Sequence, residues 1–168
     1  MISIKKALRK LASDDSLTEK KTLLWTNPNP SNSFAPTTIG SQSAGWVGPS
    51  NLNNFDFIEV YFRNQSNIEQ VATGCLRLAL NESGYITSYT NYNNTDAYIR
   101  LNARYTGFYS SGIYFESGLT KPAQSTNYSS DNTFCIPYKI YGIKFGGGSK
   151  LTYWLSRLFQ GKGGRQDD

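Results

Sequence analysis

The side chains that could do chemistry in this sequence are few and widely spaced. The chain has no histidine, which removes the usual general base and the commonest transition-metal ligand. Seven carboxylates between residues 22 and 145 are scattered, so folding would have to bring together any pair for glycoside hydrolysis. Cys75 and Cys135 have neither a histidine partner nor the spacing of a zinc site. We therefore expect a protein that is not an enzyme, with no catalytic residue, no metal site and no cofactor.

The two cysteines are too few for a disulfide framework. Cys75 and Cys135 each lie in an apolar pattern typical of strands, and free cysteine is among the most buried residue types. We predict two buried free thiols, with a single disulfide bridge as the alternative.

Tyrosine is abundant, with 12 residues in the chain. Its flat ring and hydroxyl group suit stacking on sugars and contacts between proteins. The alternative for each tyrosine is an ordinary place on a strand of a sheet, without any binding role. We select as candidate receptor contacts Tyr89, Tyr92, Tyr98 and Tyr109.

Strands must position these tyrosines, and residues 133–145 (TFCIPYKIYGIKF) contain the strongest strand pattern. Pro137 favours an edge strand or a bulge, and Gly142 favours the close approach of another backbone. We expect residues 22–26 to pair with this strand. Such pairing would make residues 22–145 one closed unit.

Apolar alternation and turn residues predict further strands at 34–41, 55–63, 70–80, 85–92, 97–104 and 113–117. A hairpin turn is predicted at 81–84. In the 97–104 strand, Arg100, Asn102 and Arg104 are expected on a solvated face. The predicted core comprises Ile58, Val60, Phe62, Leu76, Leu78, Ile99, Leu101 and Ile140. About eight strands without an internal helix predict an all-β fold, an antiparallel β-sandwich or jelly roll.

The net charge of +5 comes from the two ends of the chain. Residues 22–145 contain seven basic and seven acidic side chains. Residues 1–21 contain six basic and three acidic side chains, and residues 146–168 contain four basic and two acidic side chains. A neutral body with basic ends does not fit a groove for nucleic acid, so we expect no nucleic-acid partner.

Short amphipathic helices are expected at both termini. Apolar residues recur at helical spacing near each end, and Gly146–Ser149 reads as a flexible linker before the second stripe. We predict an N-terminal helical attachment segment (1–21), a β-sandwich domain (22–145), and a linker, amphipathic helix and loose tail (146–168). The predicted assembly residues are Ile4, Leu8, Leu11, Leu151, Trp154, Leu155, Leu158 and Phe159.

The sequence contains no signal-peptide pattern, because basic residues interrupt the apolar positions among the first 12 residues. No run approaches the roughly 20 apolar residues of a membrane span. We expect synthesis in a cytoplasm and no membrane insertion, although an interfacial role for Trp154 and Phe159 is a minor alternative.

Three stretches resemble a module of structural proteins in tailed bacteriophages that infect Gram-positive and gut bacteria. They are residues 21–35 (KTLLWTNPNPSNSFA), 57–63 (FIEVYFR) and 136–144 (IPYKIYGIK). Such modules occur in tail-tip, baseplate or fibre proteins. The resemblance covers residues 21–144 and implies a β-sandwich virion component, often multimeric, with no catalytic residues to carry over.

The resemblance and the terminal stripes together predict a virion protein, a tail, fibre or head-fibre component. Its termini would bind other virion proteins, and its sandwich would face outward for host-surface adhesion or decoration. We expect a homo-oligomer, provisionally a trimer, and a host cell-surface glycan as a further partner. The alternative is a free carbohydrate-binding module or lectin, which would need no attachment helices.

Overall fold

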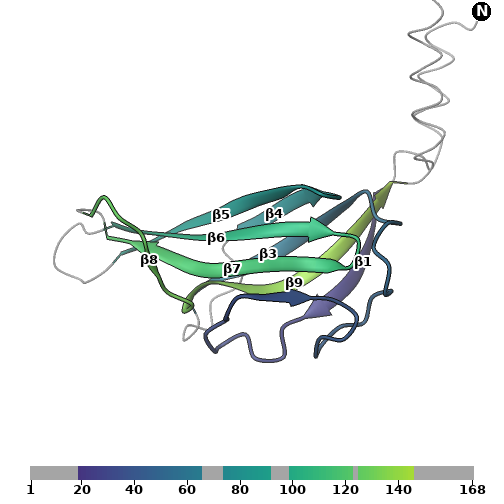
Figure 1. Ribbon diagram of the computed structural model, residues 1–168, viewed down its shortest axis with the longest axis horizontal. Helices are drawn as coiled ribbons and strands as arrows, with labels where there is room; N and C mark the ends of the chain where they lie inside the picture. Colours follow the sequence, from purple (N-terminus) through teal and green to yellow (C-terminus); the bar gives the residue numbers. More distant parts are fainter. Residues whose placement is uncertain (1–18, 66–73, 92–98, 123–124, 146–168) are drawn as a thin grey trace, which may run out of the picture. The chain divides into compact units, whose positions relative to one another are not determined.

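The computed structural model describes residues 19–65, 74–91, 99–122 and 125–145, and all regular structure in these ranges is β-strand (Figure 1). The chain divides into two units, one spanning Lys21–Ile143 and the other combining residues 1–20 with 144–168. The strands are β1 (Glu19–Thr26), β2 (Thr37–Ile39), β3 (Phe57–Gln65), β4 (Gly74–Ala79), β5 (Ser83–Asn91), β6 (Ile99–Tyr109), β7 (Gly112–Lys121), β8 (Ser129–Ser130) and β9 (Phe134–Phe145).

The strands form two sheets in a sandwich-like arrangement. Sheet A has the order β1-β9-β3-β4, and sheet B has the order β2-β7-β6-β5, with β8 also paired to β7. In Figure 1, β5, β6 and β7 lie in one layer and β9 and β3 in the other. The predicted all-β class is therefore confirmed, and the strand count is close to the predicted eight.

The predicted pairing of residues 22–26 with the last strand is confirmed, since β1 and β9 are neighbours in sheet A. Pro137 lies beside a register shift, because Tyr61 pairs with Lys139 while Phe62 pairs with Pro137. A bulge accommodates a residue that has no N–H to donate. Gly142 admits an aromatic ring rather than a backbone, because a Cβ there would lie 2.5 Å from Cδ1 of Phe55.

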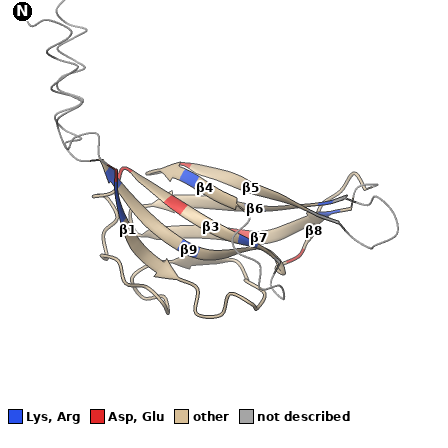
Figure 2. Ribbon diagram, turned by 180° about the vertical axis from the view of Figure 1, so that it is seen from behind, with Lys and Arg blue, Asp and Glu red and all other residues tan. Residues whose placement is uncertain are grey.

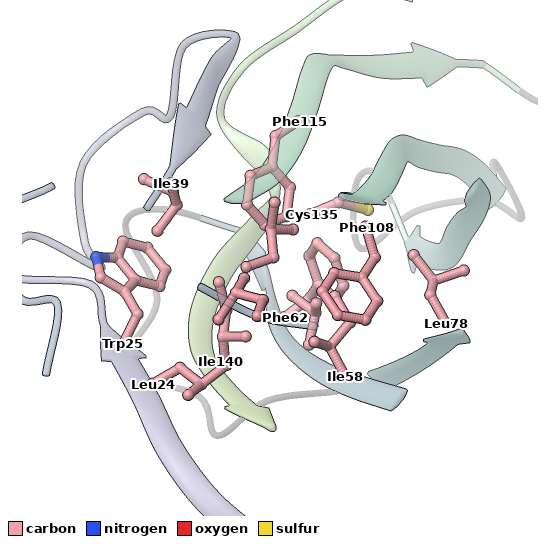
Figure 3. Close-up of a cluster of buried hydrophobic side chains, with 13 residues drawn as sticks. Leu24, Trp25, Ile39, Ile58, Phe62, Leu78, Phe108, Phe115, Cys135 and Ile140 are labelled. Atoms are coloured by element: carbon pink, nitrogen blue, oxygen red, sulfur yellow. The ribbon is translucent and has the colours of Figure 1, made fainter. Parts of the chain in front are cut away.

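A cluster of buried apolar side chains from both sheets forms the core (Figure 3). Of the predicted core residues, Ile58, Val60, Phe62, Leu78 and Ile140 are buried, and Leu76 is partly buried against the cluster. Leu101 is only half-buried, and the side chain of Ile99 lies outside the described residues. The core also contains residues that strand alternation did not select, namely Leu24, Trp25, Ile39, Leu52, Phe108, Ile113, Phe115 and Cys135.

The predicted faces of the 97–104 strand are reversed at Leu101, Asn102 and Arg104. Leu101 was expected in the core, yet it pairs with the exposed Tyr89 and so lies on the outer face of sheet B. Asn102 and Arg104 were expected in solvent, yet both are fully buried. They belong to the inner face of sheet B, where Asn102 pairs with Thr120 and Arg104 with Gly118. The prediction from alternating polarity failed here because buried side chains at this end of the sandwich are themselves polar.

The turn at 81–84 is correctly placed, but the strands on either side do not form a hairpin. β4 belongs to sheet A and β5 to sheet B. The turn backbone bonds instead to β6, with the Asn81 N–H donating to the Phe108 carbonyl at 2.8 Å and the Phe108 N–H donating to the Glu82 carbonyl at 2.9 Å. These bonds carry the chain from one sheet to the other.

The two terminal helices and their eight assembly residues lie outside the described residues, and the domain boundaries near 21 and 146 stay predictions. Within the described ranges, the chain has no helix long and apolar enough to cross a membrane.

A candidate tyrosine binding face

The outer face of sheet B presents five tyrosines, which we call the tyrosine face: Tyr85, Tyr89, Tyr105, Tyr109 and Tyr114. The register explains why they gather there. Tyr85 pairs with Tyr105 across β5 and β6, and directly paired residues share a face of a sheet. Tyr109 follows Tyr105 by four residues on β6, and alternation returns it to the same side. Tyr114 of β7 pairs with Gly107 between them.

Two of these rings contact each other, and a third lies over a glycine. Tyr85 and Tyr105 make an edge-to-face contact with ring centroids 5.2 Å apart and an interplanar angle of 66°. The ring of Tyr109 lies across Gly107, where an added Cβ would be 2.9 Å from its Cε2 atom. Gly107 thus leaves room for a ring to lie flat along the sheet.

The tyrosine face is open to solvent. Tyr89 is 68% exposed, Tyr85 59% and Tyr109 41%, whereas Tyr105 and Tyr114 are half-buried beneath or beside them. Its β5 and β6 positions contain no charged side chain, and Figure 2 shows β5 in the colour of uncharged residues. Flat rings with hydroxyl groups on these two strands can stack on a sugar ring and hydrogen-bond its hydroxyls.

The outer face of sheet A has a different character, because charged side chains cluster around Glu59. Lys21 of β1 and Arg77 of β4 both form ion pairs with its carboxylate. Tyr61 donates to the same carboxylate at 3.0 Å, and the Lys21 ammonium lies 4.6 Å from the centroids of the Tyr61 and Tyr141 rings. This cluster connects strands β1, β9, β3 and β4 across the whole sheet.

Desolvation opposes ionisation of Glu59, but hydrogen bonds from Lys21, Arg77 and Tyr61 outweigh it and lower the pKa of the carboxyl to about 2. For Lys21, desolvation is likewise outweighed by the hydrogen bonds to Glu59 and Tyr61, and the pKa of the ammonium is raised. Glu59 is therefore a fixed anion with satisfied partners. It lacks the raised pKa of a general acid.

Arg104 is fully buried between the sheets and bonds to backbone carbonyls. Its Nε atom donates to Cys135 at 2.8 Å, one terminal nitrogen to Glu116 at 2.6 Å, and the other to Phe134 at 3.3 Å. The guanidinium also lies 5.4 Å from the centroid of the Phe34 ring. Burial lowers its pKa to about 10, so the group stays charged at neutral pH.

The predicted cysteines differ from each other. Cys135 is a buried free thiol as predicted, whereas Cys75 is free but exposed. Cys75 alternates to the outer face of β4, beside the charged cluster, because its neighbours Gly74 and Leu76 occupy the inner side. Burial raises the pKa of both thiols, which disfavours the reactive thiolate. Within the described ranges, no three acidic, cysteine or histidine side chains gather to hold a metal ion.

Of the four candidate receptor contacts, Tyr89 and Tyr109 lie on the tyrosine face and are exposed. Tyr92 and Tyr98 lie outside the described residues. Tyr85, Tyr105 and Tyr114 were not selected, although all three belong to the face. The missing information was the pairing register, because only the register shows that Tyr85 and Tyr105 are cross-strand neighbours. The charged cluster was missed for the same reason.

Comparison with known protein families, with curated proteins and with solved structures gives no match for this chain.

Proposed function

We propose that this chain is a non-catalytic structural protein of a bacteriophage particle, which displays its β-sandwich outward and adheres to host-surface glycan. The observation that carries the adhesive role is the exposed tyrosine face of sheet B, whose β5 and β6 positions contain no charged side chain. The virion role rests on the resemblance of residues 21–35, 57–63 and 136–144 to tail and fibre modules. The sandwich-like fold agrees with that resemblance, although a fold by itself does not define a function.

The chemistry of the tyrosine face favours a neutral saccharide over a polyanion. Binding of phosphate or sulfate groups relies on lysine and arginine, and the β5 and β6 positions of the face have neither. Stacking on aromatic rings tolerates many sugars, because each sugar ring has an apolar side.

The adhesive role can be tested with purified full-length protein on an array of neutral and acidic bacterial surface glycans. We expect binding to neutral glycans, and loss of at least about tenfold in affinity when Tyr85 and Tyr89 are both replaced by threonine. Tyr128→Thr is the matched control, because Tyr128 is 44% exposed but follows β7 and contacts Lys121 instead. Equal loss in the control, or binding confined to acidic glycans, would contradict a role for the face.

The virion role has a separate test, detection of the protein in purified particles of the phage that encodes it. We expect Trp154→Glu with Leu158→Glu to abolish incorporation and to leave the melting temperature of the free protein nearly unchanged. The reason is that both residues lie on an apolar stripe that we assign to contact with other virion chains. Normal incorporation together with a large fall in melting temperature would show that the stripe packs on its own chain.

The alternative, a free lectin, keeps the same tyrosine face and discards the attachment role. It predicts glycan binding by the purified protein but no copies in the particle. The two experiments together therefore separate the adhesive role from the structural one.

A further inference from the structure

The edge strands of the two sheets differ in how well their backbone groups are protected from pairing with another chain. Exposed edges invite pairing with another chain, and proteins block them with charges, prolines, short strands or covering loops. β1 and β4 are the edge strands of sheet A, and β2, the two-residue β8 and β5 are those of sheet B. Within the residues that the structure describes, only β5 lacks each of these protections.

The edge of β1 is covered by the following loop. The N–H groups of Val47 and Gly48 donate to the Leu24 carbonyl at 2.8 and 3.1 Å, and the Thr26 N–H donates to Gly45. The earlier part of β1 is charged (EKK). β2 has three residues, and β4 has six with Arg77 among them.

By contrast, β5 is nine residues long, with the sequence SGYITSYTN, and contains neither a charge nor a proline. It pairs with β6 from Ser83–Gly107 to Asn91–Ile99 without a register shift, so no bulge twists its edge away. Ser83, Tyr85, Thr87 and Tyr89 are all exposed on its outer face.

From these features we infer that β5 pairs antiparallel with β5 of a second copy of this chain. A strand meets its own copy about a two-fold axis, so a charged residue close to the axis would lie near the same charge of the second copy. β5 contains no charged residue that could cause such repulsion. If the two β5 strands overlap over their whole length, residues 83–91, and keep their outer faces on the same side, Thr87 lies at the centre of the pairing. Thr87 then lies opposite Thr87 of the second copy, and Tyr85 lies opposite Tyr89.

This register joins the two sheets B into one continuous sheet and extends the tyrosine face across both copies. Tyr105 already contacts Tyr85 within one chain at 5.2 Å. The added Tyr85–Tyr89 cross-strand pairs are aromatic pairs of the kind that stabilise neighbouring strands. The inference uses the strand edge alone and does not depend on glycan binding or on the virion role.

The test places a charge at the two-fold axis of the full-length protein. Thr87→Glu and Thr87→Lys each put like charges directly opposite, so sedimentation equilibrium should show the dimer dissociation constant raised at least about tenfold. An equimolar mixture of the two variants should restore the dimer, because the opposite charges then meet. Thr38→Glu and Thr38→Lys are the matched controls, since Thr38 is exposed on β2 at the far edge of the same sheet, and should leave the dimer intact.

Cross-linking gives an independent reading of the register. Directly opposite residues of antiparallel strands have Cα atoms about 4.5–5.5 Å apart, within reach of a disulfide. In a Cys75→Ser background, Thr87→Cys should cross-link between chains on mild oxidation and Thr38→Cys should not. A wild-type monomer at the highest soluble concentration, a trimer, or an assembly that Thr87→Glu leaves unchanged would each overturn the inference.

Discussion

At the scale of single residues, Arg104 is a fully buried cation whose hydrogen bonds go to backbone carbonyls. Its hydrogen bonds go to the carbonyls of Glu116 on β7 and of Phe134 and Cys135 on β9. Cys135 has a positive φ of 49°, a left-handed conformation that is uncommon for a residue with a side chain. The guanidinium fork thus holds the start of β9 where the backbone turns unusually, and it ties the two sheets together.

Replacing Arg104 by lysine keeps the charge but supplies a single ammonium in place of the planar fork. We expect Arg104→Lys to lower the free energy of unfolding by about 3 kcal/mol, because buried carbonyls lose their donors. Arg104→Met should cost a similar amount, although it removes the buried charge. Urea titration of both variants measures the cost, and no loss in the methionine variant would show that these carbonyls find other donors.

Glu59 makes stability depend on pH. The pKa of its carboxyl is lowered from an ordinary 4.5 to about 2, so its contribution is complete above pH 4.5 and is lost as the pH falls toward 2. Glu59→Gln should therefore be less stable than wild type by about 2 kcal/mol at neutral pH, with allowance for the partly exposed Lys21. The difference should shrink through that acidic window, as urea titrations at several pH values would show. A gap that stays constant down to pH 2 would contradict the assignment.

At the scale of elements, the alternation of apolar and polar residues can be read from the sequence, whereas the register between strands depends on which strands pair in the fold. The sequence pattern correctly predicted β3, β9, the pairing of β1 with β9 and the buried core residues of β3, because these strands face an apolar interior. It failed for β6, since Asn102 and Arg104 point into a polar part of the interior where partners come from distant strands. It could not find the tyrosine face or the Glu59 cluster, because both depend on which residues pair across strands.

Gly142 of β9 shows the same dependence on distant partners. Its missing side chain makes room for the Phe55 ring, with three ring atoms within 2.7 Å of an added Cβ. We expect Gly142→Ala to destabilise the fold by about 1–3 kcal/mol, since the ring must move out of a packed site. Gly84→Ala is the control, because its Cβ would meet nothing closer than 3.3 Å, at a side-chain methyl group of Leu78. Thermal unfolding compares the two, and equal shifts would mean that the Phe55 ring moves aside freely.

At the scale of the whole molecule, the unit of residues 21–143 contains both core layers and the buried Arg104. We expect a shortened chain of residues 20–146 to fold alone and to unfold cooperatively, because its strands need no partner from the ends. Near-UV circular dichroism and thermal unfolding would measure this. An insoluble or molten product would show that the terminal segments contribute to the fold.

The loop that follows β1 also limits how large an assembly can grow. The hydrogen bonds from Val47, Gly48 and Thr26 occupy backbone groups of β1 and Gly45 that a further chain would need for strand addition. Pairing through β5 uses the one long unblocked edge among the described strands, so these strands leave no equivalent edge in a pair of copies for a third. A long, uncharged edge strand ordinarily favours the growth of fibrils. Here its pairing with a second copy would give a closed dimer and stop that growth.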